Sequence, residues 1–191
     1  MTPSLQRQLG WFAIACVGYH ALAMVSLHVL VPEVSPLSGM VGDYLSSPSQ
    51  LLSRTTFLAF AGALASLAFG LRPSLPRGLR SSVATGLIVV AILAFVSVAM
   101  FPEAANQIAR VAQPATVLTI ILFSMVLRRE QRWASVAAWF LVIPALLVFL
   151  FVITIATGYL ISIGLGGLAN RVVLVLIYTW VVLVARGLLD G

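Results

Sequence analysis

The sequence predicts an all-α membrane protein in which residues 1–191 form a single domain of six transmembrane helices, arranged as three helical hairpins. The first observation is composition: 61% of the 191 residues are hydrophobic and 8% are charged, whereas soluble domains have about 45–50% apolar and about 25% charged residues. A soluble fold of this length could not bury the excess, so it must face lipid. The second observation is six apolar blocks, at residues 9–31, 51–71, 82–101, 111–127, 134–159 and 168–189.

Prolines mark where several of these helices should end or bend. Pro32, Pro73 and Pro102 lie one or two residues after the ends of the first three blocks, where a helix is expected to stop. Pro144 lies midway along the fifth block. It removes one backbone hydrogen bond, so the sequence predicts a kink there.

The first block has two interpretations. Ala21, Leu22 and Ala23 resemble the cleavage site of a secretory signal peptide. The apolar run nevertheless continues to Val31, which is enough to cross a bilayer core of about 30 Å. We therefore expect a helix that is retained.

The second block carries a stripe of small residues. Gly62, Ser66 and Gly70 are spaced by four and share one helix face. Small side chains at this spacing let two helices approach closely in a membrane. The stripe therefore predicts a helix-facing surface.

The arginines predict orientation, because positive charge favours the cytoplasmic side of a membrane. With a cytoplasmic N-terminus, eight arginines fall on the inner side and three on the outer side. The outer three are Arg54, Arg110 and Arg171. The inner eight are Arg7, Arg72, Arg77, Arg80, Arg128, Arg129, Arg132 and Arg186. Six spans then place both termini in the cytoplasm.

The three outer arginines are candidate site residues because the spans behind them are short. Seventeen residues separate Arg54 from Arg72, and fourteen separate Arg171 from Arg186. At about 1.5 Å per residue, such spans cover roughly 21–25 Å, which is less than the ~30 Å hydrocarbon core. One guanidinium of each pair is therefore expected at or below the membrane interface, where it must snorkel or find a partner.

Carboxylates are expected on the same side. Glu33 and Asp43 fall in the first outer loop and Glu103 in the second. We predict that these acids converge with the outer arginines at one mouth, either as structural ion pairs or as a site for an anion or a lipid headgroup. The full candidate set is Arg54, Arg110, Arg171, Glu33, Asp43, Glu103 and His28.

The two histidines do not favour a metal or a cofactor. His20 and His28 both lie in the first block, about 12 Å apart along a helix axis, too far to bind one haem iron. His28 could join the outer cluster, or bind zinc with Glu33 and Asp43, although a hydrogen bond between helices is the favoured interpretation. His20 is expected to face the bundle. We expect no resident metal or cofactor.

Short motifs resemble a known family. Pro32–Ser38 followed by Gly42–Leu45, the Phe101–Glu103 end of the third block, and Gly167–Arg171 before a last helix that contains Trp180 are similar to the six-helix prokaryotic membrane family of domain of unknown function 998. The resemblance covers essentially the whole chain. Arg110 departs from it, because many members are expected to have His there. The resemblance implies a topology and a prokaryotic plasma membrane, but no activity.

The sequence therefore predicts a broad class of function and does not identify a ligand or a reaction. We favour a structural or accessory membrane protein with a charged cluster at its outer mouth. The alternatives are a transporter or a lipid- or anion-binding protein, and then a membrane-embedded enzyme; catalysis is not favoured, since no nucleophile or phosphate-binding motif is found. The expected partners are membrane lipids and a small anionic or lipid ligand, and not nucleic acid.

Overall fold

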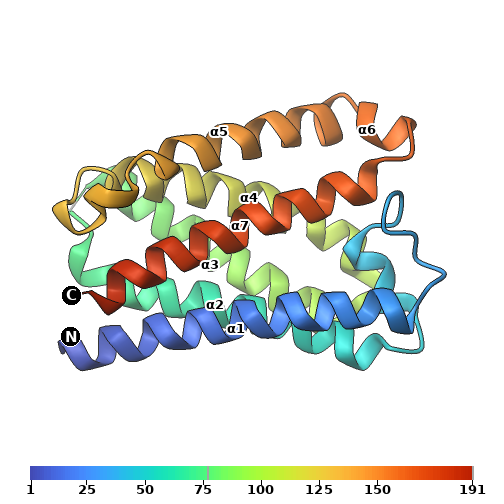
Figure 1. The fold of residues 1–191 in the computed structure, drawn as a ribbon, viewed down its shortest axis with the longest axis horizontal. Coiled ribbons are helices and arrows are strands. Elements are labelled where there is room, and N and C mark those ends of the chain that lie inside the picture. The colour runs from blue at the N-terminus through green and yellow to red at the C-terminus, as the bar shows by residue number, and fades with distance from the viewer. Residues whose placement is uncertain (77, 191) are drawn as a thin grey trace.

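A computed structural model describes residues 1–76 and 78–190, so Arg77, one of the predicted inner arginines, lies outside the described residues. The described part of the chain consists of helices, turns and loops (Figure 1). The α-helices are α1 (Pro3–Leu30), α2 (Gln50–Leu71), α3 (Leu79–Met100), α4 (Ala105–Leu127), α5 (Trp139–Phe151), α6 (Tyr159–Ser162) and α7 (Gly166–Leu189). Short 3₁₀ helices are η1 (Val41–Ser46), η2 (Arg72–Ser74), η3 (Pro102–Ala104) and η4 (Gln131–Val136), and η5 (Val152–Ala156) is a π-helix.

The long helices pack in a closed ring. Each of α1 to α4 contacts the next helix in the chain, α5 follows α4, and α7 closes the ring by packing against both α5 and α1. The chain begins and ends at the same end of the bundle, which we call the terminal end (Figure 1). The loop after α1 lies at the opposite end, near the start of α7.

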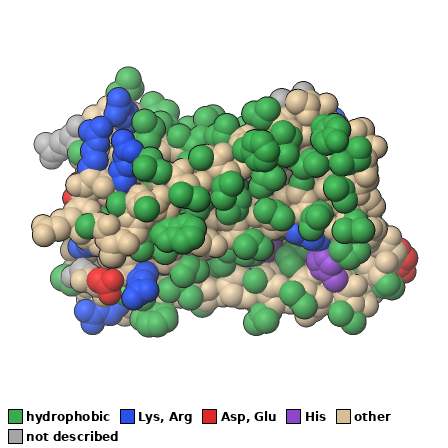
Figure 2. Space-filling model, turned by 45° about the horizontal axis from the view of Figure 1, so that its top comes forward, with side chains coloured by type: hydrophobic (Ala, Val, Ile, Leu, Met, Phe, Trp, Pro, Cys, Tyr) green, Lys and Arg blue, Asp and Glu red, His purple; other side chains and the backbone are tan. Residues whose placement is uncertain are grey.

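The surface of this bundle is apolar along its length. Among the described residues, five helices are long and apolar enough to cross a membrane: α1, α2, α3, α4 and α7, with short 3₁₀ extensions on α2 and α4. A sixth apolar helix, Trp139–Ile155, is shorter. Large hydrophobic side chains such as Leu22, Val29 and Leu93 are exposed, and Figure 2 shows hydrophobic side chains spread across one whole face. Such a surface is stable in lipid and not in water, so the protein is a multi-pass membrane protein.

Three segments differ from the predicted spans. Helix α1 begins at Pro3 rather than at 9, and the side chain of Thr2 caps its first turn. Helix α4 begins at Ala105 rather than at 111, because the polar residues Asn106 and Gln107 form its first turn. The fifth segment is not one helix over 134–159: η4 ends at Val136, α5 runs from Trp139 and gives way to the π-helix, and Gly158 then adopts a φ of 65°. Pro144 lies inside α5, and the kink there stays a prediction.

The stripe of small residues faces other helices, as predicted. A Cβ at Gly62 would lie 3.5 Å from the Cys16 Sγ of α1, and a Cβ at Gly70 would lie 2.6 Å from a methyl group of Leu188 in α7. The Ser66 side chain donates a hydrogen bond to the Gly62 carbonyl within the same helix. The stripe therefore lets α2 pack closely against both α1 and α7.

Residues 31–49, which we call the loop cap, close the end of the bundle opposite the termini. Four of its side chains are almost fully buried: Val31, Val41, Tyr44 and Leu45. They belong to a separate core cluster that also contains Leu27 of α1, Phe57 of α2 and Val98 of α3. Burying a side chain of this size stabilises by about 1.5–3 kcal/mol, so the loop cap is an integral part of the fold. We call this the loop-cap end.

Candidate functional site at the loop-cap end

Arg171 is the hub of the loop-cap end. It lies in the second turn of α7 and is half-buried. Its guanidinium donates four hydrogen bonds: from Nε to His28 Nε2 at 2.7 Å, from Nη1 to the carbonyls of Gly39 and Gly167 at 2.8 Å each, and from Nη2 to the Tyr44 hydroxyl at 3.2 Å. Four of the five N–H groups of the guanidinium are therefore used by the chain itself.

The two ring nitrogens of His28 have different hydrogen-bond partners. Arginine can only donate, so His28 Nε2 must present its lone pair to Arg171. The Met24 carbonyl can only accept, so the Nδ1 atom that it contacts must carry the hydrogen. His28 is thus held as the Nδ1–H tautomer, oriented by the backbone of its own helix. It links α1 to α7 as an acceptor.

Two glycines allow the backbone to approach Arg171. A Cβ at Gly167 would overlap the carbonyl oxygen of Gly39 and would lie 2.8 Å from that of Leu37. The Leu168 N–H also donates to the Leu37 carbonyl at 2.9 Å. Because Gly167 has no side chain, the loop cap lies directly against the first turn of α7, within reach of the guanidinium.

Asp43 and Asn170 organise the loop cap from two sides. The Asp43 carboxylate accepts a hydrogen bond of 2.7 Å from the Met40 N–H, which caps the start of η1. The Asn170 side chain accepts one of 3.3 Å from the Val41 N–H. Asp43 therefore stabilises the local turn, while Asn170 joins Arg171 in attaching the loop cap to α7.

The other predicted site residues lie around this end without joining the bonds of Arg171. Arg54 is in the second turn of α2, and its Nε is buried with no hydrogen-bond partner among the described residues. Glu33 is exposed in the loop cap, Glu103 is exposed in η3, and Arg110 is exposed on α4. The structure thus brings His28 to Arg171 directly. The hypothesis that all seven residues share a ligand stays a prediction.

Sequence reasoning missed three of the groups that hold Arg171. Tyr44 is fully buried, yet in the sequence it is an ordinary aromatic residue of a loop. Gly39 and Gly167 contribute only carbonyl groups, which leave no pattern in side-chain chemistry. A signal for Gly167 was present, because a residue four positions before an arginine on a helix offers its carbonyl to the same face.

A second polar contact lies deeper in the bundle. His20 of α1 is 1% exposed, and its Nδ1 shares a hydrogen bond with the Tyr178 hydroxyl of α7. The rings of Phe57 and Phe60 pack around it. His20 faces the bundle, as predicted, and it joins the same two helices that Arg171 and His28 join.

The comparisons with known proteins agree with the resemblance of the loop motifs. No curated protein and no solved structure matches the chain. A model of the family described as "Protein of unknown function (DUF998)" matches residues 14–187, which run from within α1 to the last turn of α7. The chain therefore belongs to the DUF998 family, whose function is unknown.

Proposed function

We propose that the protein is a structural or accessory protein of the prokaryotic plasma membrane, with six spans and both termini in the cytoplasm. Besides the five long helices, the proposed bundle needs one more span. The shorter apolar segment provides it, because α5 and the π-helix together run from Trp139 to Ala156. At about 1.5 Å per residue it covers roughly 27 Å, close to the ~30 Å core. The arginine distribution, eight against three, supports this orientation. Figure 2 shows Arg side chains gathered near one end of the molecule.

The observation that carries the structural role is the use of Arg171. A cation that binds a free ligand keeps donors available, whereas Arg171 donates four hydrogen bonds to α1, α7 and the loop cap. These four partners are an imidazole, two carbonyl groups and a hydroxyl group, and none of them is a carboxylate. Arg171 therefore holds the loop cap to the bundle through hydrogen bonds and not through an ion pair with these groups. In this proposal the charged residues of the loop-cap end close and rigidify the outer surface of the protein.

Cysteine labelling in intact cells tests the topology. In a Cys16→Ser background, a membrane-impermeant maleimide should label Ser38→Cys, which is exposed in the loop cap, and should not label Arg72→Cys at the terminal end. Both positions should react after the cells are permeabilised, which controls for expression and accessibility. Labelling of Arg72→Cys alone in intact cells would invert the orientation, and labelling of both positions would contradict a membrane-spanning α2.

A second candidate function is anion binding at the loop-cap end. It is favoured by Arg54, whose buried Nε lacks a hydrogen-bond partner among the described residues; such a group costs about 1–3 kcal/mol unless something satisfies it. In this case sulfate or inorganic phosphate should raise the melting temperature of the detergent-solubilised protein, and the rise should disappear in Arg54→Gln. An equal rise in both proteins would assign the effect to general salt stabilisation.

A further inference from the structure

A pocket of about 360 Å³ lies at the terminal end, away from the loop cap. It opens between the first turn of α3 and the end of α4. Its lining includes Arg80 and Ser81 of α3, Met125 and Val126 of α4, and Arg129 just beyond α4. Two helices that are packed against each other therefore form its walls.

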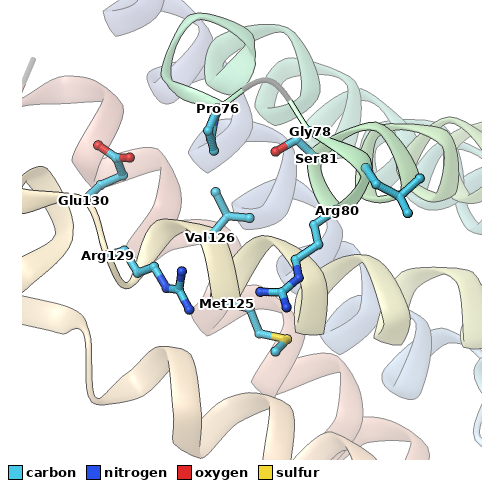
Figure 3. A pocket seen from close by; sticks show the side chains of 9 residues that line it. Pro76, Gly78, Arg80, Ser81, Met125, Val126, Arg129 and Glu130 are labelled. Atoms are coloured by element: carbon cyan, nitrogen blue, oxygen red, sulfur yellow. The ribbon is translucent and has the colours of Figure 1, made fainter.

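Two positive charges point into this pocket. Figure 3 shows the guanidinium groups of Arg80 and Arg129 directed from opposite sides toward the same space, with Met125 below them. The carboxylate of Glu130 points away from both guanidiniums (Figure 3). Two like charges facing one space repel each other, and an anion between them converts that repulsion into two attractions. The planar fork of arginine matches the oxygens of a phosphate group in particular.

The start of α3 adds to the positive field. Its N-cap is Gly78, which provides no side-chain cap, so the first N–H groups of the helix are not satisfied by a capping side chain. The positive end of the α3 dipole therefore lies at the same pocket. Ser81, which is buried at 8% exposure, brings a hydroxyl group to the lining. These groups add hydrogen-bond donors of the kind that phosphate oxygens accept.

Besides Glu130, the lining has an apolar part that faces outward. Leu79 is 81% exposed and Met125 is 39% exposed, and both line the pocket beside the arginines. In a bilayer these side chains would contact acyl chains. A ligand that fits both parts has a phosphate at one end and hydrocarbon at the other, which excludes a small soluble anion as the best match.

We propose that this pocket binds an anionic phospholipid, with its phosphate between Arg80 and Arg129 and its acyl chains along Leu79 and Met125. The assignment of this lipid to the cytoplasmic leaflet rests on the orientation proposed above. The proposal that the pocket binds a lipid does not depend on that orientation, because binding can be measured in detergent, where the protein has no inner or outer side. Failure of the topology and failure of the lipid site are therefore distinguishable.

The test is native mass spectrometry of the detergent-solubilised protein titrated with phosphatidylglycerol, phosphatidylcholine or glycerol 3-phosphate. The double variant Arg80→Gln/Arg129→Gln is compared with Arg72→Gln/Arg186→Gln, which removes two exposed arginines from the same end outside the pocket. Each variant lowers the formal net charge of +6 by two. We expect phosphatidylglycerol to bind the parent more tightly than phosphatidylcholine, and the pocket variant to bind it about tenfold more weakly. The control variant should bind like the parent.

Three outcomes would overturn the proposal. Equal weakening in both variants would mean diffuse attraction of anionic lipid to a basic surface. Equal binding of the two lipids by the parent would mean that the pocket does not select an anionic headgroup. Binding of glycerol 3-phosphate as tight as that of the lipid would assign the pocket to a soluble phosphate. The variant Arg80→Lys/Arg129→Lys keeps both charges, and partial recovery of lipid binding in it confirms that the loss in the Gln variant is not misfolding.

Discussion

At the loop-cap end, Arg171 donates four hydrogen bonds to its own chain. At the terminal end, Arg80 of α3 and Arg129 just beyond α4 point into a pocket. The residue type is the same and both sets lie near helix ends. The difference is the supply of acceptors: glycines at 39 and 167 bring two carbonyl groups to Arg171. An arginine near a membrane interface is structural where the backbone can approach it, and available for a ligand where it cannot.

The largest expected effect is that of Arg171→Ala. The change leaves Tyr44 and two carbonyl groups without their donor in a region closed by the loop cap, so we expect a loss on the order of 3 kcal/mol. For a chain of this length that corresponds to a melting temperature lower by roughly 6–12 °C. Thermal unfolding in detergent is the measurement. A melting temperature within 2 °C of the parent, on this rough scale, would show that Arg171 is not a structural hub.

Gly167→Ala sharpens the comparison by testing the backbone contact alone. The added methyl group would overlap the Gly39 carbonyl, so the loop cap must move away, at a cost of about 1–3 kcal/mol. The matched control is Gly86→Ala in α3, where a Cβ meets nothing within 4 Å and helix propensity favours alanine. Proteolysis of the loop cap should accelerate in Gly167→Ala only. Equal protection of both variants would contradict the close approach.

His28→Leu should cost less, about 1–2 kcal/mol, because it removes one acceptor of the four. His28→Gln is the control, since its side-chain carbonyl can accept from the same guanidinium. We expect the Gln variant to melt closer to the parent than the Leu variant. The reverse order would mean that the role of His28 is packing against Tyr44, with which its ring is in contact.

The smallest effect is expected at the terminal end. Arg80→Ala removes an exposed side chain, so in lipid-free detergent its stability should stay within about 0.5 kcal/mol of the parent. A loss as large as that of Arg171→Ala would break the comparison, because Arg80 would then be as structural as Arg171. Thermal unfolding under identical detergent conditions measures both.

Much of the helical organisation could be predicted from hydropathy. The ends of α2, α3 and α7 lie within a few residues of the predicted spans, because the change from apolar to polar residues coincides with the helix ends there. The start of α4 could not be predicted from hydropathy, because Asn106 and Gln107 are polar residues that nevertheless belong to the helix. Nor could the π-helix at Val152–Ala156, because its residues are as apolar as those of α5.

The candidate site was predicted in part. The short span between Arg171 and Arg186 made Arg171 a candidate site residue, and His28 was expected to be able to join the same cluster. The partners expected for the arginine were carboxylates, because charge is visible in a sequence. The partners that the structure gives to Arg171 are carbonyl, hydroxyl and imidazole groups, and their approach depends on tertiary packing between segments far apart in the chain.

That separation has a consequence for biosynthesis. His28 and Arg171 lie 143 positions apart, and a ribosome adding about 5–20 residues per second needs roughly 7–30 s to make that stretch. During this interval the loop cap lacks the helix against which its backbone docks; in the orientation proposed above, it is translocated before that helix has been made. The segment is thus a late-folding element near the start of the chain, accessible to proteases and chaperones until the last helix is inserted.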